Sequence, residues 1–274
     1  LTSVTLTESI SAIRYGMFSY CTALTNITIP ESVTFIASNV FEGCTSLSAF
    51  YGKFASADNR CLILDGSIVA FAHNGLNSYT IPEGVTSINL GVFKGCSELQ
   101  NITIPEGVTD IGGEAFAGCE SLTSITIPDS VTWIGSYAFG GCYSLTSITI
   151  PEGVTGFGDR VFLGCTSLSA FYGKFASADS RCLIIDNKII AFAPKGLSTY
   201  TIPDGVTSIG DSAFSGCSSL SSITIPEGVT EIGSNAFFDC SSLKTITIPK
   251  SVTSIGSSAF QYCTSLITIY CKPT

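Results

Sequence analysis

LQNITIPEGVTDIGGEAFAGCES, residues 99–121, decides the fold, because close variants of this stretch follow one another along the chain. Residues 122–144 and 243–265 are two further good copies. Their shared pattern is L-x-x-I-T-I-P-[ED]-[GS]-V-T-x-I-G-x-x-A-F-x-x-C-x-x. A fixed period of roughly 20 to 30 residues indicates one supersecondary unit per repeat, stacked on its neighbours around a continuous core.

The repeats account for all 274 residues, which predicts a single domain over 1–274. Nine 23-residue units begin at Leu1, Leu24, Leu76, Leu99, Leu122, Leu145, Leu197, Leu220 and Leu243, two 29-residue units begin at Leu47 and Leu168, and a partial unit begins at Leu266. Residues 24–144 return as 145–265, which indicates a block duplication. Because the chain starts within a repeat and without Met, we expect it to be a fragment of a longer protein.

Each 23-residue unit predicts two strands and a tight turn. In I-T-I, Ile102 and Ile104 alternate with Thr103, as in a half-buried strand, and identical strands of successive units should pair in parallel into one long sheet. V-T-x-I predicts a second short strand, and the Gly after it should adopt a left-handed conformation. A-F-x-x-C predicts one short helical turn. The fold class is therefore mostly β, a solenoid with a parallel sheet and short helical turns.

The two 29-residue units differ because each carries a β-hairpin signal. CLIL-DG-SIVAFA, residues 61–72, places Asp-Gly between two apolar runs, a strong two-residue turn signal. CLII-DN-KIIAFA, residues 182–193, keeps the pattern with Asp-Asn.

Composition excludes several classes of partner. A net charge of −9 argues against nucleic acid, which binds basic surfaces, and against anionic membranes. No segment reaches the roughly 18 consecutive apolar residues of a membrane span. No G-x-S-x-G, H-E-x-x-H or phosphate-binding loop is present, and His73 is the only histidine, so we expect no catalytic residues, no metal and no cofactor.

The cysteines form one column of the repeat rather than a metal motif. Nine of the twelve follow the Phe of the unit by three residues: Cys21, Cys44, Cys96, Cys119, Cys142, Cys165, Cys217, Cys240 and Cys263. Stacked side chains point the same way, so we expect buried, reduced thiols rather than disulfides. Cys61 and Cys182 should also be buried, in the hairpin strands.

The repeat resembles the BspA-like leucine-rich repeat of bacterial proteins, and the resemblance covers essentially the whole chain. The 29-residue units resemble a hairpin variant of that repeat. The resemblance implies a leucine-rich-repeat solenoid in a cell-surface or secreted bacterial protein that binds host proteins, matrix or glycans without catalysis. A structural spacer that presents another domain is the alternative. We expect a monomer that does not insert into a membrane.

The outward strand positions are the candidate binding residues. Thr103, Thr126 and Thr149 lie on the hydroxyl-rich face of the expected sheet, which could dock a ligand or be only a solvated strand face. Tyr51 and Tyr172 replace Thr on this face in the 29-residue units. Trp133, the only tryptophan, stands at the outward position of a V-T-x-I strand, and exposed aromatics are enriched at binding hot spots.

A column of carboxylates after the Pro of the repeat is the alternative site. It comprises Glu31, Glu83, Glu106, Asp129, Glu152, Asp204 and Glu227. The column could attract Ca²⁺ or a basic partner, or it could consist of solvated turn residues that maintain solubility.

Overall fold

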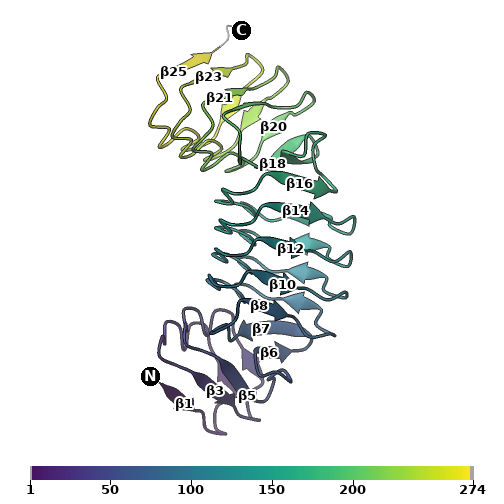
Figure 1. Cartoon of the computed structure of the whole chain (residues 1–274), viewed down its shortest axis with the longest axis vertical. Coiled ribbons are helices and arrows are strands. Elements are labelled where there is room, and N and C mark those ends of the chain that lie inside the picture. Colours follow the sequence, from purple (N-terminus) through teal and green to yellow (C-terminus); the bar gives the residue numbers. More distant parts are fainter. Residues whose placement is uncertain (1, 272–274) are drawn as a thin grey trace. The chain divides into compact units, whose positions relative to one another are not determined.

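The computed structural model describes residues 2–271 and is built from stacked β-coils (Figure 1). It divides into two compact units, Leu1–Gly140 with Pro151–Gly158 and Gly141–Ile150 with Asp159–Thr274. Within each unit the L-x-x-I-T-I strands form a first wall, the V-T-x-I strands and the hairpins a second, and the A-F-x-x-C segments a third. The single domain over 1–274 stays a prediction.

In the first unit, the first wall contains β1 (Ser3–Thr5), β3 (Asn26–Ile29), β5 (Ala49–Gly52), β8 (Ser78–Thr80), β10 (Asn101–Thr103) and β12 (Ser124–Thr126). The second wall contains β2 (Ala12–Ile13), β4 (Phe35–Ile36), β6 (Cys61–Leu64), β7 (Ser67–Phe71), β9 (Ser87–Ile88), β11 (Asp110–Ile111), β13 (Trp133–Ile134) and β15 (Gly156–Phe157). The sheets are ordered β1-β3-β5, β12-β10-β8, β2-β4 and β15-β13-β11-β9-β7-β6.

In the second unit, the first wall contains β14 (Ser147–Ile150), β16 (Ala170–Gly173), β19 (Thr199–Thr201), β21 (Ser222–Thr224), β23 (Thr245–Ile248) and β25 (Thr268–Cys271). The second wall contains β17 (Cys182–Ile185), β18 (Lys188–Phe192), β20 (Ser208–Ile209), β22 (Glu231–Ile232) and β24 (Ser254–Ile255). The sheets are ordered β14-β16, β19-β21-β23-β25 and β17-β18-β20-β22-β24.

The apolar columns of the repeat form the core, as predicted. In the 23-residue coil that starts at Leu99, each inward side chain is at most 6% exposed. These side chains are Leu99, Ile102, Ile104, Val108, Ile111, Phe116 and Cys119. Strand pairing keeps the register of the repeat, because Ile102 pairs with Ile125 in the next coil. Each coil therefore completes its core only by stacking on its neighbours.

The expected hairpins are confirmed. β6 and β7 pair antiparallel, as do β17 and β18, whereas all other strand pairs among the described residues are parallel. Asp65 and Gly66 both have positive φ, 50° and 77°, which is the geometry of a two-residue type I′ turn. Asp186 and Asn187 repeat it, with φ of 49° and 62°.

The expectation of one long first-wall sheet is wrong, because each hairpin coil interrupts it. β5 pairs with β3 but not with β8, and β16 pairs with β14 but not with β19. The cause is local. Residues 53–60 fold back so that the Phe50 N–H donates to the Asn59 carbonyl at 2.7 Å, which occupies the edge of β5 that the next strand would use. β8 and β19 consequently begin new sheets.

The third wall is not helical, which corrects the expected helical turns. None of residues 2–271 lies in a helix, and the A-F-x-x-C segments are consecutive turns. Successive backbone N–H groups of these segments alternate between two kinds of acceptor. Those of Glu114, Phe116 and Gly118 donate to carbonyls of the next coil at 2.7–2.8 Å, whereas those of Ala115, Ala117 and Cys119 donate three residues back. Half of the donors that a helix needs therefore bind the neighbouring coil.

The Gly after V-T-x-I is required for a reason other than the one expected. Gly112, Gly135 and Gly158 do not have positive φ. A Cβ added to Gly135 would lie 2.4 Å from the backbone nitrogen of Gly113, so this column permits close approach of successive coils. The left-handed residue comes two positions later, at Glu114 and Tyr137 for example, with φ of 54° and 57°.

The cysteine column is buried in eight of its nine members; Cys21 is the exception and is partly exposed, in the first coil of the chain. Cys119 Sγ donates to the Phe93 carbonyl at 3.2 Å, and Cys240 Sγ donates to the Phe214 carbonyl at 3.1 Å. The small thiol thus fills the core and satisfies a buried carbonyl of the preceding coil. Cys61 and Cys182 are buried as expected, and burial raises the pKa of each thiol to about 12.

Candidate binding surface

The predicted threonine face exists within each unit. In the first unit Thr103 of β10 pairs with Thr126 of β12, and both side chains are exposed. In the second unit Thr149 of β14 pairs with Tyr172 of β16, whose side chain is 50% exposed. Tyr51 of β5 is 45% exposed but belongs to the separate sheet β1-β3-β5. The structure therefore divides these five residues among three sheets.

Trp133 lies on a different wall from the threonines. It is the outward residue of β13, pairs with Asp110 and Gly156, and is 45% exposed. A Cβ on Gly156 would lie 2.9 Å from the indole ring, so the ring packs directly over that glycine. Trp133 is thus an exposed aromatic side chain of the second wall, and it is not part of the threonine face.

A polar recess, which the sequence did not predict, lies where β8 begins its sheet. It is a shallow, open recess of about 320 Å³ lined by Asp58, Ser78, Tyr79, Thr80, Asn101 and Thr103. Of the predicted residues it contains only Thr103. Its volume is within the roughly 300–1,000 Å³ of small-ligand sites, and every side chain that lines it carries a hydroxyl, amide or carboxylate group.

Asp58 is held in place by its own loop. Its Oδ1 accepts hydrogen bonds from Ser56 Oγ at 2.6 Å and from the Arg60 N–H at 3.0 Å. Partial burial acts to raise the Asp58 pKa, but these bonds and the Tyr79 hydroxyl outweigh it and hold the pKa below its usual value. The recess therefore presents a fixed negative charge at neutral pH.

The second unit contains the same arrangement of residues. Asp179 accepts from Ser177 Oγ at 2.6 Å and from the Arg181 N–H at 3.1 Å. Below the two loops, Cys61 Sγ and the Tyr79 hydroxyl lie 3.1 Å apart, and Cys182 Sγ and the Tyr200 hydroxyl lie 3.2 Å apart. The duplication thus repeats both the loop and the Cys–Tyr contact beside it.

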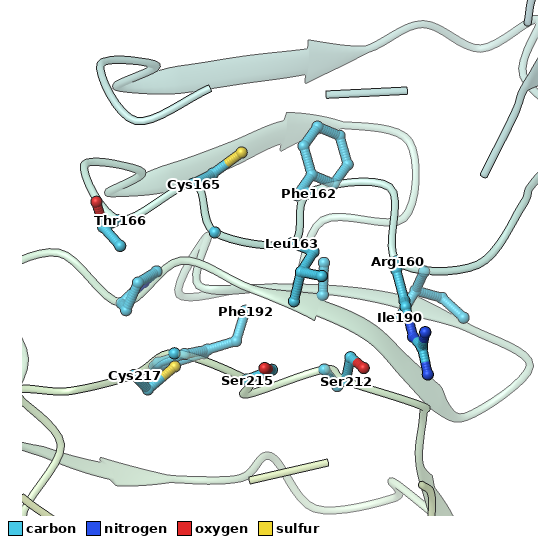
Figure 2. A pocket seen from close by; sticks show the side chains of 15 residues that line it. Arg160, Phe162, Leu163, Cys165, Thr166, Ile190, Phe192, Ser212, Ser215 and Cys217 are labelled. Atoms are coloured by element: carbon cyan, nitrogen blue, oxygen red, sulfur yellow. The ribbon is translucent and has the colours of Figure 1, made fainter. Parts of the chain in front are cut away.

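Two small cavities lie where a hairpin coil leaves a gap in the third wall. Figure 2 shows the one in the second unit, which is lined by Phe162, Cys165, Phe192 and Cys217 among others; its volume is about 20 Å³. The equivalent one in the first unit is about 30 Å³ and is lined by Asn39, Phe71 and Gly91, among others. Each has room for about one water molecule and is too small for an organic ligand.

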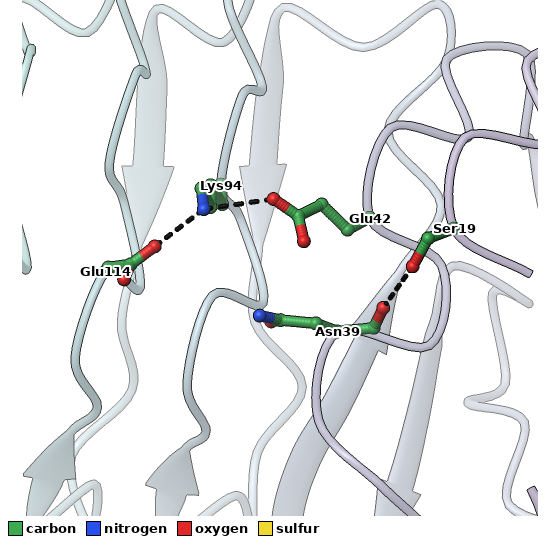
Figure 3. Close-up of polar contacts among 5 residues, drawn as sticks. All are labelled: Ser19, Asn39, Glu42, Lys94 and Glu114. Atoms are coloured by element: carbon green, nitrogen blue, oxygen red, sulfur yellow. Dashed lines mark hydrogen bonds and ion pairs between the residues drawn. The ribbon is translucent and has the colours of Figure 1, made fainter. Parts of the chain in front are cut away.

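A charged bridge closes the gap of the first unit (Figure 3). Lys94 Nζ lies 2.6 Å from Glu114 and 3.0 Å from Glu42, and the hydrogen bond with Glu114 contributes most to raising the Lys94 pKa. Ser19 Oγ donates to the Asn39 carbonyl at 2.9 Å nearby. Sequence reasoning missed this bridge because Glu42 is separated from Lys94 and Glu114 by the hairpin coil.

The carboxylate column and His73 do not form a site with other side chains among the described residues. The carboxylate column is exposed at all seven positions. Across the part of the chain that the structure describes, no group of three His, Cys, Asp or Glu side chains is placed to hold a metal ion. His73 is partly buried, which lowers its pKa. No helix within residues 2–271 has the length and apolarity to cross a membrane.

Comparison with known proteins gives a consistent family. The protein-family model described as "BspA type Leucine rich repeat region" matches this chain in six copies, over residues 1–58, 67–179 and 185–274. No curated protein sequence matches the chain.

Several solved structures share the fold. A leucine rich cell surface protein from Faecalibacterium prausnitzii is 28% identical, with a TM-score of 0.56, and the match covers 100% of this chain and 88% of that one. A leucine-rich repeat protein from Eubacterium ventriosum is 23% identical (TM-score 0.52), and this chain spans 61% of it. The pneumococcal vaccine antigen PcpA is 21% identical (TM-score 0.55; 100% of this chain, 68% of PcpA). The last two show the fold alone.

Proposed function

The chain belongs to the BspA-type leucine-rich repeat family, and from this membership we propose that it is a non-enzymatic adhesion module of a bacterial cell-surface or secreted protein. Its ligand is a host or matrix protein, or a glycan carried by one. The surface location is supported by the relative from Faecalibacterium prausnitzii, which is described as a cell surface protein.

The first-wall face carries this proposal. Within each of its sheets the side chains are held at the regular spacing of hydrogen-bonded strands, so ordering them on binding costs little conformational entropy. Tyr51 and Tyr172 add large amphipathic contacts at equivalent positions of the duplication. Thr149 pairs with Tyr172 on neighbouring strands, Thr103 and Thr126 present hydroxyl groups on a separate first-wall sheet of the first unit, and Trp133 offers a further contact on the second wall.

Binding to purified matrix proteins tests the proposal. The panel contains collagen, fibronectin, laminin and mucin, and binding is measured by surface plasmon resonance. We expect the folded chain to bind at least one of them saturably. The heat-unfolded chain serves as the matched control and should not bind, because the face exists only when coils are stacked. Absence of saturable binding to every member would favour the alternative role, a spacer that presents another domain.

A further inference from the structure

β8 presents a free strand edge to the recess. β8 pairs only with β10, and that pairing uses alternate residues: the Ile81 N–H donates to the Thr103 carbonyl at 3.0 Å, and the Asn101 N–H donates to the Asn77 carbonyl at 3.3 Å. Successive backbone groups of a strand point to opposite sides, so the N–H and C=O of Ser78 and Thr80 face away from β10. No hydrogen bond joins these groups to other described residues on that side.

The recess lies along this edge. Ser78, Tyr79 and Thr80 line it together with Asp58, and its volume is about 320 Å³. β5 cannot close the edge, because the Asn59 carbonyl already accepts the hydrogen bond from the Phe50 N–H. An unpaired edge next to open space is a template for pairing with another chain.

The charge beside the edge indicates what kind of chain fits. Asp58 is exposed, and its Oδ1 is oriented by Ser56 and Arg60, so the carboxylate is already fixed before a ligand arrives. Salt bridges among the described residues involve Glu42, Glu114 and Lys94, and none involves Asp58. A lysine or arginine side chain is therefore the complement to this wall.

We propose that the interruption of the first wall at each hairpin coil is a docking site for an extended protein segment, which adds as a strand to the edge of β8 and places a basic side chain against Asp58. The segment's backbone pairs with Ser78 and Thr80, which supplies affinity, and the basic side chain supplies specificity. The inference rests on the proposed function and names the mode of protein recognition.

The duplication supplies a second site. β19 is likewise the edge of its sheet, the Ile202 N–H donates to the Thr224 carbonyl at 3.0 Å, and Asp179 is oriented by the same bonds as Asp58. The N–H and C=O of Thr199 and Thr201 therefore face away from β21, as those of Ser78 and Thr80 face away from β10. The chain should bind two such segments.

Titration calorimetry with a synthetic peptide tests the proposal. The probe is a blocked seven-residue peptide of alternating threonine and valine with a central lysine, and we expect two peptides per intact chain. Asp58→Asn should reduce the number to one, since asparagine keeps the oxygen that accepts from Ser56 and Arg60 but loses the charge. Asp58→Asn combined with Asp179→Asn should weaken binding at both sites at least tenfold. Asp129→Asn makes the same charge change in an exposed turn and should leave two bound peptides per chain.

Two peptide controls separate backbone pairing from charge. Methylation of the alternate peptide nitrogens along one edge should abolish binding, and a central glutamate should weaken it at least tenfold. Equal binding of the methylated peptide, equal binding of the glutamate peptide, or insensitivity to the double Asn variant would each overturn the proposal, as would absence of peptide binding. If the chain still binds a matrix protein in that case, the proposed function stands and only this mode of recognition fails.

Discussion

Replacing Phe116 with alanine is expected to lower the free energy of unfolding by about 3–5 kcal/mol, the usual cost of truncating a buried phenylalanine. Phe116 is 0% exposed and stacks between Phe93 and Phe139, with ring centroids 5.2 and 5.4 Å away. Its removal leaves a cavity between three coils, and neighbours held by backbone hydrogen bonds cannot collapse into it. Urea denaturation followed by Trp133 fluorescence measures the loss.

Phe35→Ala is the matched control for this change. Phe35 lies in the same compact unit as Phe116, residues 1–140 with 151–158, and is 52% exposed. Its truncation should therefore change the free energy of unfolding by no more than about 0.5 kcal/mol. Equal losses for Phe35→Ala and Phe116→Ala would show that the phenylalanine column is not the core of the stack.

Replacing Gly135 with alanine should lower the free energy of unfolding by about 1–3 kcal/mol, the range for overpacking a close-packed interior. The new Cβ would lie 2.4 Å from the Gly113 nitrogen and 2.7 Å from the Gly112 carbonyl carbon, and backbone of the adjacent coil cannot move aside without breaking its hydrogen bonds. Gly140→Ala, whose closest contact would be 3.3 Å, is the control and should cost about 0.5 kcal/mol or less.

Gly135→Asn distinguishes the two explanations for this glycine column. If the column required a left-handed backbone, asparagine would be tolerated, because it adopts that conformation more easily than most residues. If close approach is the requirement, asparagine should destabilise at least as much as alanine in the same urea experiment. Retention of full stability by Gly135→Asn would contradict the close approach that the structure shows.

The repeat predicted the core because its signal comes from side chains at fixed positions. Ile102, Val108 and Phe116 are buried as the periodicity required, and Asp65-Gly66 marked the hairpin turn by its own chemistry. The third wall was not predictable in this way. Its left-handed position is occupied by Glu114, Tyr137 and Ser212 in different coils, so no residue type marks it. Its conformation is stabilised by hydrogen bonds such as that from the Glu114 N–H to the Ser136 carbonyl, 2.8 Å long.

The candidate site was predicted only in part for a related reason. Exposure of Tyr51, Tyr172 and Trp133 follows from their outward positions in the pattern, and the structure agrees. The recess depends on how residues 53–60 fold back over β5, and a loop without periodicity gives no such signal. The repeated ADNRC and ADSRC sequences, which contain Asp58 and Asp179, were visible in the duplication but carried no indication of what they face.

The first-wall face, rather than the acidic turn edge, is expected to contact the ligand. The most direct test of this claim is the dissociation constant of two variants for whichever matrix protein the chain binds. The Tyr51→Ser, Tyr172→Ser pair should weaken binding at least tenfold, because each tyrosine removed is a large exposed contact. The Glu106→Gln, Asp129→Asn, Glu152→Gln triple should change it less than about threefold, since exposed charges are screened by salt. Loss of binding in the triple with retention in the tyrosine pair would contradict the claim.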